Sequence, residues 1–432
     1  MTTYNMDELE EWDAKIEKLV GDVGLNCYTQ HFEICSYEDM LCYEAYLGIP
    51  SHYPHWSFGK AYERQKSFYQ YNFVGLPYEL VINSDPCIAY LMQDNTLLTQ
   101  ILTMAHVYAH NDFFKNNRLF KRDTRANMAV DMFKTHANRI REYIQDPSIG
   151  PEKVERILDA AHGLKFQMSR YGEAKEPDKK QRAEEVTKAI PERLQGDLLG
   201  FLAERGNLIE WERDLINIVR QETMYFIPQL ETKIMNEGWA SYWHYQLLNQ
   251  LNLPQGLHLE FLKRHNLVVC PHPGKINPYF VGFKIFEYLA KQPGGRDQIM
   301  AIRAEDRDQS FIRRYLNQEL CETLQLFSYG IQGDDIVITE VSNEDGWKTI
   351  RDHFADSVGL GGIPMIQPSV VDKGTLVLEH ICDDRELELK YAQETIKYVA
   401  DLWGGKVDLR TQVNKDVKII SCSEAKLVTV HS

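Results

Sequence analysis

The stretch Asn95–Asn117, NTLLTQILTMAHVYAHNDFFKNN, decides how the rest of this chain is interpreted. Its pattern predicts one amphipathic helix, with His106 and His110 four residues apart on the same face. Two imidazoles at this spacing can bind one metal ion. Such a site needs a third ligand from elsewhere, and we expect Glu237 in NEGWASYWH to supply it from a later helix.

The composition predicts a large globular protein of the cytoplasm. A formal net charge of −15 over 432 residues argues against nucleic acid and against anionic lipid surfaces as partners. No apolar run approaches the ~20 residues of a membrane span, and the acidic N-terminus lacks the pattern of a secretion signal. The eight cysteines form no CxxC pair, so we expect them to be small apolar fillers.

The hydropathy pattern changes near Ser328 and predicts an α+β protein with two domains. Residues 1–327 are expected to form a mainly helical, zincin-like domain, and residues 328–432 a smaller α+β domain. In the second domain, strand-like alternation marks four segments: DIVITEV (335–341), TLVLEHI (375–381), ELELKYA (386–392) and KLVTVH (426–431). A helix over 391–403 is expected to stop at Gly404.

Other segments of the first domain give local predictions. Helical spacing marks residues 6–23 and 28–46, and the Pro-rich, aromatic-rich segment 50–73 is expected to be a loop. Residues 78–83 are a strand candidate. Residues 221–249 predict a long helix that bends or restarts at Pro228, and the charged segment 170–189 is expected to be a solvated loop or exposed helix.

Val107 limits the chemistry that the His pair can perform. In an HExxH zincin, the Glu after the first His activates the water, and here that position is Val107. A hydrolase would need a substitute, and the candidates are His244, Asp112 and Glu222. Ser241 lies one turn from Glu237 and suits a role in orienting a ligand.

Glu237 strengthens the prediction of a metal site. NEGWAS resembles the second-helix signature of the zincins that use a glutamate ligand. A carboxylate among tryptophans and tyrosines needs a cation, because desolvating it alone costs several kcal/mol, and a metal or an arginine would serve. We therefore expect zinc or another divalent metal on His106, His110 and Glu237, with Gly238 allowing close helix packing.

Two further histidines occur in loop-like sequence, where function often concentrates. They are His55 in HWSFGK and His272 in PHPGK. Either is also compatible with a packing or turn role. Lys60 and Lys275 follow them and can offer positive charge to an anionic substrate group.

Several long strings in order resemble the SpoVR family, the stage V sporulation protein R-like proteins: HWSFGK, PCIAYLMQDNT, AHVYAHNDFFKNN, IVRQETMYFIPQLETKIMNEGWASYWH and INPYFVGFKI. The resemblance implies a bacterial cytosolic protein linked to spore cortex formation, or to stress and stationary-phase physiology in other bacteria. It also implies, as possible partners, a PrkA-type serine kinase and a YeaH/YhbH-type protein. The absence of the zincin glutamate looks like a trait of the family.

Two functions remain open at this point. The first is a metallo-hydrolase of zincin ancestry that acts on a peptide, amide or cell-wall-related substrate, with His244 or Asp112 assisting. The second is a non-enzymatic regulatory or scaffolding subunit of the kinase module, in which a metal would lock two helices together.

Overall fold

The computed structural model describes residues 4–49, 52–70, 79–168, 190–191, 194–271, 275–332, 335–344, 346–383 and 385–431. The charged segment 170–189 and His272 lie outside these ranges. The chain divides into two compact units, one of residues 1–135 and 225–359 and one of residues 136–224 and 360–432. Each unit is described by itself.

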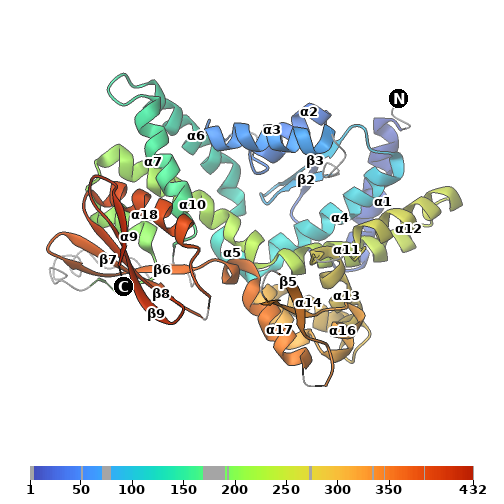
Figure 1. Cartoon of the computed structure of the whole chain (residues 1–432). Helices are drawn as coiled ribbons and strands as arrows, with labels where there is room; N and C mark the ends of the chain where they lie inside the picture. The colour runs from blue at the N-terminus through green and yellow to red at the C-terminus, as the bar shows by residue number, and fades with distance from the viewer. Residues whose placement is uncertain are drawn as a thin grey trace. The chain divides into compact units, whose positions relative to one another are not determined.

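The first unit is mainly helical (Figure 1). In chain order, its elements before residue 135 are α1 (Met6–Asp22), β1 (Gln30–Cys35), α2 (Tyr37–Ala45), α3 (Trp56–Gln70), β2 (Glu79–Ile82), β3 (Cys87–Met92), α4 (Leu97–Asn116), α5 (Arg118–Asp123) and the start of α6 (Ala129–Gln145). After the end of α10 (Glu210–Glu231) follow α11 (Lys233–Gln250), α12 (Gln255–Val268), α13 (Pro278–Ala290), α14 (Gly295–Glu305), α15 (Asp308–Tyr315), α16 (Gln318–Thr323), β4 (Ser328–Gln332), β5 (Asp335–Glu340) and α17 (Gly346–Ser357).

Helix α4 is the centre of this unit. Thr96 begins it by accepting the backbone N–H of Thr99, and Asn117 follows its last residue. Every side chain from Leu98 to Phe114 is buried. The helix was expected, but it is not amphipathic. Because α1, α11, α12 and the strands pack around it, it has no solvent-facing side.

Helix α11 lies between α4 and α13. It begins after Thr232, where the chain leaves α10 three residues beyond Pro228, so the expected interruption is present. Gly238 of α11 meets Gly282 of α13, and a Cβ added at Gly238 would lie 2.3 Å from the Cα of Gly282. The close packing expected of Gly238 is therefore made with α13.

A three-stranded sheet in the order β1-β3-β2 brings the first part of the chain to α4. Strand β1 is parallel to β3, and β2 is antiparallel to it. Glu79, the first residue of β2, thereby comes close to α4, which contacts β2 and β3.

The second unit combines a sheet with helices. Its helices are α7 (Pro151–Leu164), α9 (Leu198–Arg205), most of α10 and α18 (Leu389–Trp403), and its strands are β6 (Met365–Asp372), β7 (Thr375–Ile381), β8 (Val407–Val413), β9 (Asp416–Cys422) and β10 (Val428–His431). The strand order is β10-β9-β8-β7-β6, in which only the β7–β8 pair is parallel. Helix α18 connects these two parallel strands and packs on β8 and β9.

The α+β class is confirmed, but the units differ from the expected domains 1–327 and 328–432. Helices α7 and α9 pack with α18, and α9 also contacts β6, so they belong with the C-terminal sheet. The physical reason is that one face of this sheet carries buried Leu376, Leu378 and Leu409, which helices must cover. A boundary based on local pattern cannot include helices contributed by an earlier part of the chain.

Three local predictions were wrong. The segment 50–73 was expected to be a loop, but Trp56–Gln70 forms α3, because its prolines all precede the helix. The segment 28–46 contains strand β1 before helix α2, since β1 is fixed by distant pairing with β3. The segment 386–392 is not a strand, because Glu388 caps α18 by accepting the N–H of Tyr391. The helix over 391–403 does end at Gly404, at φ 73°.

Within the described ranges, no helix combines the length and the apolar composition needed to cross a bilayer.

Candidate metal centre

Four side chains from three elements converge in the first unit. His106 and His110 come from α4, Glu237 from α11 and Glu79 from β2. An oxygen of Glu237 lies 3.5 Å from Nε2 of His110 and 3.9 Å from Nε2 of His106. Oε1 of Glu79 lies 3.9 Å from the same Nε2 of His106. Ligand-type atoms of Glu79, His106 and His110 all lie within 4.8 Å of one another.

The distances between the imidazole nitrogens and the carboxylate oxygens are longer than those of hydrogen bonds. At 3.5–3.9 Å the nitrogens and oxygens are too far apart for ordinary hydrogen bonds, which span about 2.7–3.2 Å. Four ligands about 2.0–2.1 Å from a tetrahedral zinc ion lie about 3.3 Å from one another. The imidazoles and carboxylates of this cluster are ligand types that could hold a divalent cation.

The second nitrogen of each imidazole has a buried partner. Nδ1 of His106 lies 2.8 Å from Nδ1 of His244, and Nδ1 of His110 lies 2.9 Å from Oδ1 of Asn236. Nε2 of His244 lies in turn 2.8 Å from Nδ1 of His265 on α12. Since Nδ1 is engaged in both His106 and His110, both imidazoles direct Nε2 toward the carboxylates, as metal-binding histidines commonly do.

The electrostatics of the cluster follow from burial and from mutual charge. Burial, with the nearby charge of His106, lowers the pKa of His110 to about 4. Burial opposes the ionised form of Glu237, but the neighbouring histidines and Lys233 outweigh it and lower its pKa. Burial raises the pKa of Glu79, with only partial opposition from His106. The cluster therefore combines neutral imidazole at His110 with a carboxylate at Glu237 at neutral pH, the protonation states that bind a metal.

Tyr279, at the start of α13, completes the surroundings of the carboxylates. Its ring lies 6.2 Å from that of His106, centroid to centroid, and is nearly parallel to it. The negative charge of Glu237, followed by burial and by Glu79, raises the pKa of Tyr279 well above its ordinary value. Its phenol thus stays protonated and can donate to an oxygen.

Asp112 and Glu222, two of the side chains predicted to replace the zincin glutamate, already have other partners. Asp112 is fully buried and accepts hydrogen bonds from Arg303, from the backbone of Asn26 and from the indole of Trp239. Burial raises its pKa to about 6, although Arg303 opposes the shift. With these donors around it, Asp112 ties α4 to α11 and α14. Glu222 pairs with His136 in the second unit, whereas the proposed ligands belong to the first.

Two other side chains that the sequence singled out are His55 and Ser241. Nδ1 of His55 lies 2.7 Å from Oγ of Ser57, and its ring packs against Trp56 and Phe58. These contacts favour a role at the start of α3. Ser241 is buried one turn from Glu237, and its Oγ has no hydrogen-bond partner among the described residues.

Sequence reasoning missed Glu79, Asn236, His265 and Tyr279. Glu79 carried a usable signal, because it is the one charged residue in the predicted strand 78–83. Asn236 directly precedes Glu237. His265 and Tyr279 carried no comparable signal, since their proximity depends on how α12 and α13 pack against α11.

Two family models match most of this chain. The family model described as SpoVR like protein matches residues 3–188 and 173–363, and that of the SpoVR-like C-terminal domain matches residues 364–414. The chain belongs to the SpoVR family. It is similar to "Uncharacterized protein YcgB" of Escherichia coli (strain K12), with 33% identity over 488 residues that cover 96% of this chain and 94% of the relative. No solved structure matches it.

The SpoVR match includes every residue of the candidate centre. Glu79, His106, His110 and Glu237 all fall within the region matched by the SpoVR like protein model. The boundary to the C-terminal family domain at residue 364 lies close to residue 360, where the chain enters the second unit for the last time.

Proposed function

We propose that this SpoVR-family chain binds one divalent cation, zinc or another, between α4, α11 and β2, and hydrolyses an amide bond in a peptide or cell-wall-related substrate. The proposal rests on one observation: the Nε2 atoms of two imidazoles lie 3.5–3.9 Å from oxygens of two carboxylates. A partly buried polar cluster whose imidazole–carboxylate distances exceed those of ordinary hydrogen bonds is best explained by a shared cation.

The residues take distinct roles in this proposal. His106, His110 and Glu237 hold the cation, because the Glu237 oxygen lies within 4 Å of both imidazoles. When bound, the cation supplies Lewis-acid activation of a carbonyl group and of water. Of the two imidazoles, only that of His106 lies within 4 Å of a Glu79 oxygen. We therefore assign Oε1 of Glu79 to take the proton from the attacking water. Val107, at the position of the usual zincin glutamate, cannot do this. Tyr279 donates to the developing oxyanion.

His244 and Asp112 act through other residues in this proposal. His244 holds the ring of His106 through the Nδ1–Nδ1 contact and does not touch the substrate. Asp112 holds the helices that carry the ligands, because its oxygens already accept from Arg303, Asn26 and Trp239. The protein would act in the cytoplasm, in spore cortex formation or in the stress response.

The alternative is a regulatory or scaffolding subunit in which the cation only locks α4 against α11, alongside a PrkA-type kinase and a YeaH/YhbH-type protein. This alternative is favoured by the burial of His106 and His110, which are 4% and 6% exposed. A substrate would have little space through which to reach a metal bound to their Nε2 atoms. Both functions need the same ligands, but only the hydrolase needs Glu79 to accept a proton.

One set of variants tests the proposal and separates the two functions. We expect one equivalent of divalent metal per native chain by elemental analysis, lost in His106→Ala and Glu237→Gln and kept in the exposed-site control His353→Ala. Glu79→Gln should keep the metal but abolish release of new amines from a peptide mixture or from peptidoglycan. No metal in the native protein would refute the centre. Metal with no amine release from any substrate would favour the structural alternative.

A further inference from the structure

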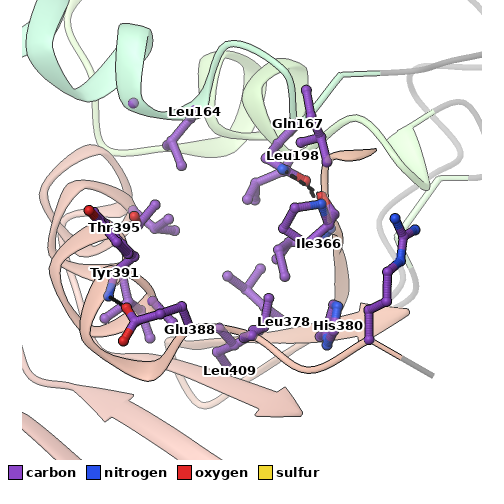
Figure 2. A pocket seen from close by; sticks show the side chains of 18 of the residues that line it. Leu164, Gln167, Leu198, Ile366, Leu378, His380, Glu388, Tyr391, Thr395 and Leu409 are labelled. Carbon is purple, nitrogen blue, oxygen red and sulfur yellow. Dashed lines mark hydrogen bonds between the residues drawn. The ribbon is translucent and has the colours of Figure 1, made fainter. Parts of the chain in front are cut away.

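The second unit contains a cavity of about 480 Å³ between the sheet and its helices. Figure 2 shows its lining, which Leu164 of α7, Leu198 of α9, Thr395 of α18 and Leu378 and Leu409 of the sheet provide in part. The volume falls in the range of about 300–1,000 Å³ typical of small-molecule sites. All lining residues belong to this one unit.

The floor of the cavity is the covered face of β7 and β8. Alternate residues of β7 point to this face, and Leu378 is paired with Leu409 of the parallel strand β8. Ile396 and Val399 of α18 line the same space. The body of the cavity is therefore aliphatic, and burying apolar ligand surface there is favourable by about 25 cal/mol per Å².

One polar side chain interrupts this aliphatic face. His380, two residues after Leu378, is only 9% exposed and lines the cavity. Its Nδ1 lies 3.0 Å from Oγ1 of Thr411, while Nε2 has no hydrogen-bond partner among the described residues. In Figure 2 its ring lies at one end of the cavity, beside Ile366. An imidazole kept in an apolar wall can give a ligand one directed hydrogen bond.

Charged residues gather at the rim. Asp383, Arg385, Glu386 and Glu388 line it, three carboxylates against one guanidinium. Arg385 is paired with Asp383, so its charge is already compensated. Glu386 and Glu388 accept backbone N–H groups. The rim thus repels an anionic head group.

We propose that this cavity binds a small molecule with an aliphatic body and an uncharged hydrogen-bonding head, such as a fatty alcohol, whose head reaches His380. A cationic head would lose its hydration beside the buried imidazole, and an anionic head would also meet the acidic rim. This site is independent of the proposed metal centre, whose ligands all lie in the other unit.

The test uses the full chain and the neutral fluorophore N-phenyl-1-naphthylamine. The fluorophore is displaced by 1-decanol below its solubility limit, or by decanoate or decylammonium below their micelle concentrations. We expect 1-decanol to displace the fluorophore at the lowest concentration. Thr395→Phe fills the cavity and should weaken 1-decanol binding about tenfold or more. Lys390→Phe adds the same ring at an exposed position of α18 outside the lining and should leave binding unchanged.

His380→Leu tests the polar contact. Loss of one neutral hydrogen bond should weaken 1-decanol binding by the folded variant about fivefold. Thr411 also loses its partner, so the thermal midpoint of unfolding is measured to confirm that the variant is folded. Ala392→Leu is a second filling variant if Thr395→Phe unfolds the protein. The proposal is overturned if the native chain binds no probe, if both filling variants bind 1-decanol normally, or if a charged head group binds more tightly than the alcohol.

Discussion

The Nδ1 atoms of His106 and His244 lie 2.8 Å apart, so one of them must donate a proton and the other must accept it. If His106 presents an unprotonated Nε2 to a metal, its Nδ1 carries the proton and donates to His244. His244 is then protonated at Nε2 and donates to Nδ1 of His265, 2.8 Å away. Three imidazoles therefore share one consistent set of tautomers, and that set orients His106 as a ligand.

His244→Phe should weaken metal binding, because it keeps a ring in the buried position but removes the acceptor for His106. Loss of such a partner typically costs 10- to 100-fold in metal affinity. Competition with a chromophoric chelator measures this change. His353→Ala, an exposed histidine on α17, is the control. Unchanged affinity in His244→Phe would show that His106 needs no such support.

Metal removal should lower the stability of the first unit, because the proposed cation joins α4 to α11. A ligand present at about 1,000 times its Kd stabilises the folded state by about 4.1 kcal/mol. Adding a chelator should therefore lower the thermal midpoint of unfolding by several degrees, and restoring the metal should reverse it. His106→Ala should be insensitive to the chelator. A midpoint that does not respond in the native chain would contradict the proposed linkage.

Arg303→Met should strongly destabilise the protein. Asp112 has a fully buried side chain, and that of Arg303 is 9% exposed, so the variant leaves a buried charge without its partner. Breaking such a pair costs about 3–5 kcal/mol, which urea unfolding would detect. Lys121→Met, at an exposed position of α5, should change stability by less than about 0.5 kcal/mol. An equal effect of the two substitutions would mean that the Asp112 pair contributes little.

Gly282→Ala should separate α13 from α11. The added Cβ would lie 2.1 Å from the carbonyl oxygen of Ile234, so the backbones must move apart. Overpacking of this kind costs about 1–3 kcal/mol or more. The control is Gly21→Ala in α1, where a Cβ meets no atom within 4 Å. That control should gain stability, by up to about 1 kcal/mol, because alanine favours the helix.

Local pattern predicted the elements that local interactions stabilise. The helix that carries His106 and His110, the stop at Gly404 and the interruption after Pro228 all depend on backbone preferences within a few residues. It failed for β1, whose pairing partner β3 lies more than fifty residues later. It also failed for α3, where nearby prolines masked a helical segment.

The sequence by itself determined the family, the α+β class and the spacing that puts two imidazoles on one face of α4. Only the tertiary structure decided which carboxylates lie near these imidazoles. It places Glu79 beside His106, whereas Asp112 forms an ion pair with Arg303. The physical reason is that helical periodicity fixes neighbours three or four residues apart, whereas side chains on separate elements meet only through packing. The grouping of α7 and α9 with the C-terminal sheet has the same origin.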